Sequence, residues 1–253
     1  MNSTPSSATS VPRDRAKYFY AGAAILLLVL TVIGFRHFFF HGGAYPGRPL
    51  TPPIRGRLIQ HGVAMSAWII LLIVQPLLIV NNKYKVHMTL GKVGVVLAVC
   101  IVFLGCRVAV GAAGVNPPDE KIWGLVPKQF LAIPLMAIVL FAGFVLVGVW
   151  NRNRPEIHKP MMLFATLTAV AAAIDRIDFM TNLYMNWGLA ALLGPFFAPT
   201  VIGLALLLLK WALTRSFDPV FTADLVVLAV CGLLAMKLAT TQVWDQFASF
   251  LLG

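Results

Sequence analysis

Residues 58–91 read LIQHGVAMSAWIILLIVQPLLIVNNKYKVHMTLG, and this stretch decides the fold class. It contains an apolar run over residues 58–80, a polar turn at Asn81-Asn82-Lys83 and the start of a second apolar run. A helix needs about 20 apolar residues to cross a bilayer core of about 30 Å, and both runs are long enough. The stretch therefore predicts two transmembrane helices joined by a polar turn at one membrane surface.

The rest of the chain repeats this pattern. Seven apolar runs of sufficient length lie near residues 18–38, 58–80, 88–111, 126–150, 160–182, 188–212 and 219–241. Residues 1–16 are rich in Ser, Thr and Pro, which predicts a disordered tail. Residues 242–253 form a short amphipathic tail that is expected to lie on the membrane surface. We therefore predict an all-α integral membrane protein whose residues 17–241 form a seven-transmembrane-helix bundle.

Composition and charge agree with a membrane protein. Hydrophobic residues make up 59% of the chain and charged residues only 11%, where a soluble domain carries about 25% charged residues. This excludes a soluble enzyme and makes the lipid bilayer the expected partner. The net charge is +11, but the bases are spread between the apolar runs, so we expect no nucleic-acid partner.

The basic residues also predict the orientation. If the N-terminus is inside, inner segments hold 11 of the 20 Lys and Arg residues, outer loops hold 6, and 3 lie within or at the ends of runs. Basic residues accumulate on the cytoplasmic side of membrane proteins. We therefore expect a bacterial inner (plasma) membrane protein with a cytoplasmic N-terminus.

The interior of the chain contains a weak internal repeat. Residues 58–87 and 129–158 have the same length, and each ends in a basic loop followed by a β-branched residue and a histidine. These endings are Val86-His87 and Ile157-His158. The repeat predicts that runs two and three, and runs four and five, form two matched hairpins related by an axis along the membrane normal.

The two matched histidines are candidate cofactor ligands. If the repeats pack about their axis, the imidazoles of His87 and His158 face each other, and two histidines from different helices are one arrangement for axial ligation of haem. The alternative is that each is an interfacial histidine beside a lysine, with no special role. Pro160 also makes His158 a candidate helix cap.

A second polar group is expected at the opposite membrane surface. Asp175 and Asp178 are three residues apart, so they share one helix face, and either could pair with Arg107. This could be a structural ion pair, or a polar pocket that binds a quinone head group, a proton or a small solute. His61 and Gln75 share one face of their helix, so Gln75 is a further candidate for lining a polar intramembrane cavity.

These residues carry a resemblance to known proteins. A histidine opening one helix (His61), a glutamine near its far end, a basic loop and then His87-x-x-Leu90-Gly91 resemble a pattern in uncharacterised bacterial multi-span membrane proteins. Residues 155–162 are similar to a second feature of those proteins. The resemblance covers about residues 58–180, and the family implies no established activity.

A more distant resemblance concerns the histidines alone. The chain is similar to the transmembrane dihaem cytochromes b that use ascorbate, in which four histidines on four successive helices bind two haems. That likeness implies His61, His87 and His158 as haem ligands and haem b as the cofactor. The fourth position falls near Ala132, which cannot ligate iron. The resemblance therefore implies one haem site and not two.

The expected biochemistry is b-type haem binding or membrane electron transfer, with a quinone or another redox partner. Two alternatives stay open from the sequence. One is a small-solute or proton-coupled transporter, and the other is an assembly or structural subunit of a membrane complex. The sequence does not decide whether the protein is an enzyme.

Overall fold

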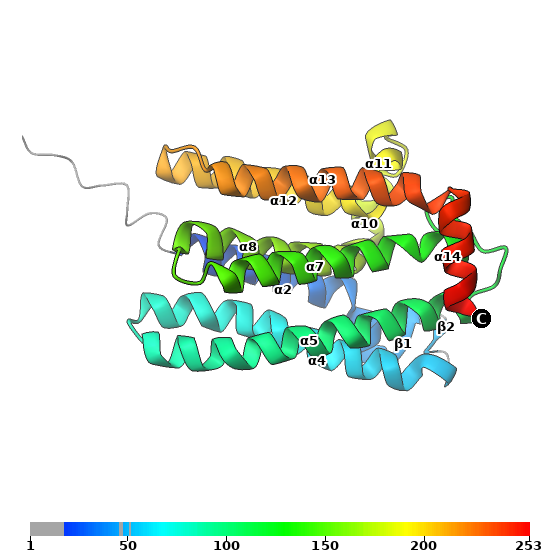
Figure 1. The fold of residues 1–253 in the computed structure, drawn as a ribbon, viewed down its shortest axis with the longest axis horizontal. Coiled ribbons are helices and arrows are strands. Elements are labelled where there is room, and N and C mark those ends of the chain that lie inside the picture. The colour runs from blue at the N-terminus through cyan, green and yellow to red at the C-terminus, as the bar shows by residue number, and fades with distance from the viewer. Residues whose placement is uncertain (1–17, 46–47, 51) are drawn as a thin grey trace, which may run out of the picture.

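The computed structural model describes residues 18–45, 48–50 and 52–253. The predicted disordered tail of residues 1–16 lies outside this part of the chain. The described residues form an elongated bundle of helices that run back and forth along one axis (Figure 1). The helices are α2 (Phe19–Gly34), α3 (Arg36–His41), α4 (Pro52–Val80), α5 (Tyr84–Val115), α6 (Pro127–Phe130), α7 (Ala132–Trp150), α8 (Pro155–Ala169), α9 (Ala171–Ile174), α10 (Asp178–Tyr184), α11 (Gly188–Leu193), the 3-10 turn η1 (Gly194–Phe196), α12 (Phe197–Thr214), α13 (Pro219–Ala239) and α14 (Gln242–Leu252).

A minimal two-stranded sheet is the one departure from helix among the described elements. Strand β1 (Gly43–Tyr45) pairs antiparallel with β2 (Arg48–Pro49). It lies between α3 and α4 and touches α3. The prediction of an all-α architecture therefore holds for the bundle itself.

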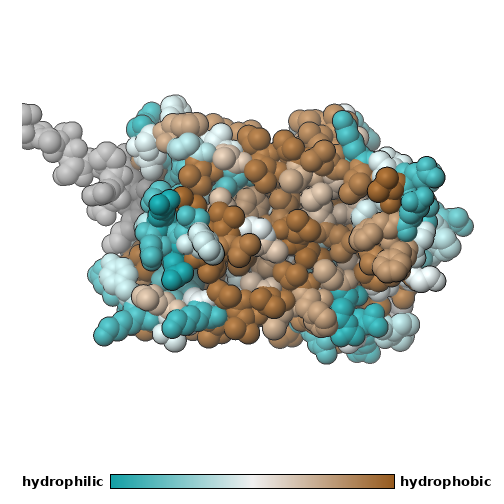
Figure 2. Space-filling model, in the orientation of Figure 1, coloured by the Kyte–Doolittle hydropathy of each residue, from teal (hydrophilic) through white to brown (hydrophobic). Residues whose placement is uncertain are grey.

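Five segments of the described chain are long and apolar enough to cross a membrane. They are Pro52–Val80, Tyr84–Val115, Pro127–Trp150, Gly188–Thr214 and Pro219–Ala239. Helix α2 is a shorter apolar helix of 16 residues. Figure 2 shows a broad hydrophobic band across the middle of the face in view, with hydrophilic residues gathered at its two ends. This is the surface of a multi-pass membrane protein, while the count of seven spans stays a prediction.

The two ends of the bundle differ. The histidine end, as we call it, carries the α4–α5 turn at residues 81–83 and the α7–α8 turn at residues 151–154. At the opposite end, helix α14 lies across the bundle (Figure 1). We call this the α14 end. There Lys128 forms an ion pair with Asp245 at 2.6 Å, and Trp244 Nε1 donates a hydrogen bond to the main-chain oxygen of Lys128 at 3.0 Å. The predicted amphipathic tail is therefore a helix packed on the bundle end.

The helices pack as hairpins in layers. Helix α4 packs chiefly on α5, and α7 on α8, so the two hairpins that the sequence predicts are present, although the repeat that relates them stays a prediction. Helix α13 packs on both α7 and α8, and α12 lies beside it. Between these layers Phe164, Phe196 and Phe221 are fully buried. Their burial places the core around α8 and α13.

The run predicted over residues 160–182 is not one continuous helix. Helix α8 ends at Ala169, α9 ends at Ile174, and the backbone of Ile177 (φ −94°, ψ 87°) has left the helical region before α10 begins. A Cβ on Gly34 would collide with the main chain of Ala173. The backbones of α2 and α9 are therefore in direct contact at this point. The break redirects the residues after Ile174, which matters for the acidic side chains discussed below.

Candidate functional site

The structure brings His87 and His158 together at the histidine end. His87 lies in the first turn of α5 and His158 in the first turn of α8. Their ring centroids are 6.4 Å apart, and the two ring planes are nearly perpendicular, at 85°. The structure thus brings the two imidazoles together from the two hairpins, with one ring plane nearly perpendicular to the other.

Each ring is oriented by a main-chain oxygen of the preceding long helix. His158 Nδ1 lies 2.9 Å from the oxygen of Gly148 in α7, and His87 Nδ1 lies 3.4 Å from the oxygen of Gln75 in α4. A carbonyl oxygen can only accept a hydrogen bond, so Nδ1 is the nitrogen that carries the proton. In a neutral imidazole this leaves the lone pair on Nε2. Metal-ligating histidines are usually held by such a hydrogen bond from their other nitrogen.

Gly148 favours this contact. A Cβ at residue 148 would lie 2.5 Å from Met162 Cε, the flexible end of that side chain, and 3.0 Å from Met161 Cβ. The absence of a side chain at residue 148 therefore favours the close packing of α8 on α7. This close approach places the Gly148 oxygen within reach of the His158 ring.

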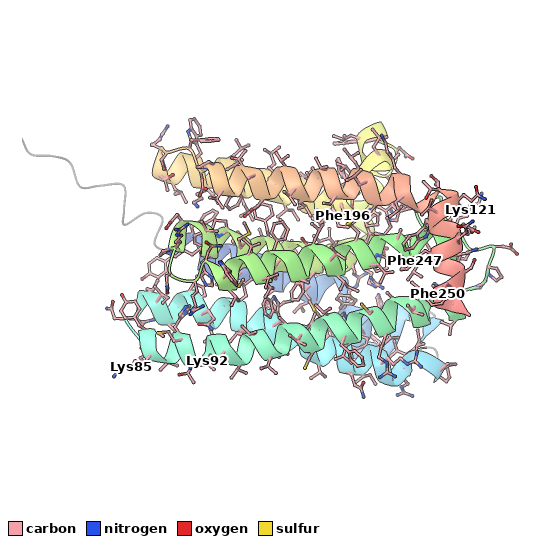
Figure 3. The ribbon with its side chains drawn as sticks, in the orientation of Figure 1. Lys85, Lys92, Lys121, Phe196, Phe247 and Phe250 are labelled. Carbon is pink, nitrogen blue, oxygen red and sulfur yellow. The ribbon has the colours of Figure 1, made fainter. Side chains whose placement is uncertain are left out.

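The turns that carry the two histidines are strongly basic. Lys83 and Lys85 precede His87, and Arg152 and Arg154 precede His158. All four are exposed at the histidine end, where Figure 3 labels Lys85. Such side chains are natural partners for a carboxylate or phosphate group brought close to the histidine pair.

His61 does not join this pair. It lies 14 residues before Gln75 on α4, which corresponds to about 21 Å along a helix. Its ring packs beside α5, where a Cβ on Gly105 would lie 3.5 Å from His61 Cε1. Its Nδ1 is buried without a hydrogen-bond partner in the described part of the chain. The structure therefore groups two of the three predicted haem ligands, not three.

The four residues of the predicted polar intramembrane pocket are not assembled. Gln75 lies at the histidine end, where its main-chain oxygen contacts His87. Arg107 follows His87 by 20 residues of the same helix, or about 30 Å. Gln75 and Arg107 therefore lie near opposite ends of the bundle.

At the α14 end the two acidic residues have other partners than Arg107. Asp175 Oδ2 accepts a hydrogen bond from Trp123 Nε1 at 2.8 Å. Asp178 is largely exposed and lies 3.8 Å from Arg36. The exposed Arg107 has its guanidinium carbon 5.6 Å from the centroid of the Phe103 ring, on its own helix. The structure therefore does not pair Arg107 with Asp175 or Asp178, and the helix that was expected to carry both acids ends at Ile174.

Burial changes the acidity of Asp175. This residue follows the last residue of α9 and lies outside the helices that are long enough to cross a membrane. Desolvation by burial raises the pKa of Asp175 to about 6, against the opposing effects of the Trp123 hydrogen bond and the charge of Arg176. Asp175 is therefore a group that titrates close to neutral pH.

A second polar cluster at the histidine end was missed by the sequence prediction. Lys210, near the end of α12, forms an ion pair with Asp218 and donates a hydrogen bond to the Tyr20 hydroxyl at 2.8 Å. Its ammonium group also lies 5.3 Å from the ring centroid of Phe221. Asp224 in the second turn of α13 is 2% exposed and interacts electrostatically with Asp218 and Lys210. The sequence marks Asp224 as an acid within an apolar run, but it gives no sign of the residues around it.

The described residues contain no group of three or more His, Cys, Asp or Glu side chains able to hold a metal ion by themselves. The His87–His158 pair is therefore the candidate site for a group that needs only two protein ligands. Comparisons of the chain with protein-family models, curated proteins and solved structures give no match. The likeness to cytochromes b stays an expectation from the sequence.

Proposed function

We propose that His87 and His158 hold one b-type haem as its two axial ligands, and that the protein transfers electrons in a membrane. The observation that carries the proposal is the facing pair of imidazoles, each with Nδ1 directed at a main-chain oxygen. His61 is left out of the ligand set because it lies far along α4 from this pair.

The separation of the two rings fits a shared metal. Two metal–nitrogen bonds of about 2 Å, together with the radii of two imidazole rings, add to roughly 6 Å between centroids. The observed distance is 6.4 Å. The two Nδ1–carbonyl contacts are the feature that distinguishes this pair from an ordinary ring contact at the same distance.

The surroundings of the pair suit an anionic, largely apolar group. Apolar helices α4, α5 and α7 lead away from the histidines into the membrane band, and the exposed bases of the two turns stand at the aqueous edge. Lys83, Lys85, Arg152 and Arg154 would neutralise carboxylates of a bound porphyrin. When bound, a haem with two histidine ligands supplies one-electron redox chemistry.

The proposed setting follows from the charge distribution. The histidine end carries the basic turns, so we place it on the cytoplasmic side of a bacterial inner membrane. A quinone or a redox protein is the proposed electron partner. A transporter or an assembly subunit, the two alternatives, would have no need of haem.

The experiment is an absorption spectrum of the protein purified after expression with an adequate haem supply. We expect a Soret band in the wild type and its loss in His87→Ala and in His158→Ala. His61→Ala is the matched control, because this histidine lies in α4 away from the pair, and the band should persist. A wild type without a Soret band, or a band lost only in His61→Ala, would exclude the proposed site.

A further inference from the structure

Apart from the histidine pair, we propose that Asp224 is a proton-binding carboxyl group that exchanges its proton with the aqueous phase at the histidine end, beside the Lys210–Asp218 ion pair. The proposal does not depend on haem. It gives the membrane domain a site for taking up and releasing a proton, which neither the sequence pattern nor the proposed electron-transfer function contains.

The burial of Asp224 is the first observation. Its residue is 2% exposed, on the face of α13 that packs into the core with Phe221 and Leu228. Its Oδ2 atom is buried and has no hydrogen-bond partner among the described residues. A lone carboxylate in such a place is costly, and binding a proton removes the charge that causes the cost.

The ammonium group of Lys210, which belongs to the cluster, is already engaged by other partners. Lys210 Nζ pairs with Asp218 and donates to the Tyr20 hydroxyl, and the rings of Phe19 and Phe221 lie 5.9 and 5.3 Å from it. Aromatic faces and a carboxylate together fix an ammonium group in place. Lys210 therefore neutralises Asp218 and leaves Asp224 without an ion-pair partner in the described structure.

The other elements packed on α13 add little charge near Asp224. Helices α7 and α11 and the turn η1 carry no ionisable side chain, and the one acid of α14, Asp245, pairs with Lys128 at the α14 end. Helix α8 contributes Lys159, whose ammonium group lies 5.9 Å from the Tyr20 ring and interacts electrostatically with Lys210. Helix α8 also carries Glu156 and His158 in its first turn. The charges that act on Asp224 are thus concentrated at the histidine end.

The cluster beside Asp224 meets water at the α12–α13 turn. The side chains of Lys210 and Asp218 lie there and are 16% and 19% exposed. In the proposal, the O–H bond of Asp224 breaks, the proton passes to water at this turn, and the new carboxylate interacts electrostatically with Lys210 and Asp218. Proton uptake reverses the step, and no oxidant or reductant is needed.

The test is infrared difference spectroscopy of the protein in lipid vesicles, titrated from neutral to alkaline pH. Asp175→Asn is used as the background, so that the other buried aspartate does not contribute. We expect the carbonyl stretching band of one protonated carboxylic acid per chain at neutral pH, and its loss at alkaline pH. No titrating carboxylic acid band in this background would overturn the proposal.

Two further variants assign the band. In Asp224→Asn it should be absent. In Asp178→Asn, the control at the other end of the bundle, whose side chain is 74% exposed, it should persist. Asp224→Glu keeps a carboxylic acid at this position and provides a second assignment, since a glutamate should keep the band and shift its frequency. A band that is unchanged in both Asp224 variants would contradict the assignment. Haem absorbance is not part of this test, so its result is independent of the histidine proposal.

Discussion

His158 Nδ1 donates a hydrogen bond of 2.9 Å to the main-chain oxygen of Gly148, ten residues earlier in the chain and on the neighbouring helix. The contact joins the end of α7 to the start of α8 across the α7–α8 turn. It fixes the proton on Nδ1 and with it the position of the free lone pair on Nε2. The orientation of His158 therefore depends on how closely two helices pack at a single glycine.

We predict that Gly148→Ala lowers haem retention. The new methyl group would meet Met161 Cβ and Met162 Cε, so we expect the start of α8 to shift away from α7 and the His158 hydrogen bond to weaken. Loss of such a supporting contact typically costs about 10- to 100-fold in metal affinity. The measurement is the haem-to-protein ratio after purification and after competition with an apo haem-binding protein.

Gly143→Ala is the matched control for this prediction. It lies on the same helix, one and a half turns earlier, and a Cβ there meets nothing within 4 Å. Haem retention should be unchanged in this variant. Equal losses in Gly143→Ala and Gly148→Ala would show that the effect is not due to the His158 contact.

We predict that Thr166→Val destabilises the bundle. Trp68 Nε1 donates a 2.9 Å hydrogen bond to Thr166 Oγ1, and this bond connects α4 to α8 at a site where both residues are buried. Valine keeps the shape but leaves the indole N–H without an acceptor, which costs about 1–3 kcal/mol. The midpoint of unfolding in a denaturing detergent titration measures the change.

Thr168→Val is the control for the Trp68 contact. Thr168 is equally buried on the same helix, but its hydroxyl donates to the main-chain oxygen of Phe164 within α8. Its substitution leaves no donor on another helix unpaired, so a clearly smaller loss is expected. A loss as large as that of Thr166→Val would mean that the interhelical bond adds nothing to stability.

We predict that the stability of the protein falls as pH rises from about 4 to about 6. Burial raises the pKa of Asp175 from 3.8 to about 6, so within this window the folded state binds the proton more tightly than the unfolded state. Stability is therefore full below the unfolded pKa and is lost as pH rises through the folded pKa. Thermal unfolding midpoints across this range measure the effect.

Two variants make the pH dependence specific. Asp175→Asn should flatten the slope, because the amide carries no charge at either end of the range. Asp178→Asn should leave the slope in place, because the Asp178 side chain is 74% exposed. If the slope survives in Asp175→Asn, another group is responsible for it.

The location of the two histidines after matching basic turns could be predicted from the sequence. His87 and His158 each follow a basic turn after a stretch of equal length, and each opens a helix. Such a pattern is local, so the two histidines can be placed at the same membrane surface without knowing the packing. The tight contact at Gly148 could not be foreseen, because it depends on Met161 and Met162 of a neighbouring helix.

The failures have equally specific causes. Pairing Arg107 with Asp175 or Asp178 assumed one uninterrupted helix over residues 160–182, and the break after Ile174 removes that basis. The Lys210 cluster depends on Tyr20, which is 190 residues away along the chain. No spacing rule relates such residues, so the partners of Asp224 are visible only in the folded bundle.

The central claim is that one haem is held between His87 and His158. The most direct measurement is the number of haem groups per chain, determined by the pyridine haemochrome assay on the purified wild-type protein and on the double variant His87→Ala/His158→Ala. The account predicts one b-type haem per wild-type chain and none in the double variant. A wild type that contains no haem when haem supply is adequate, or a double variant that keeps its haem, would contradict it.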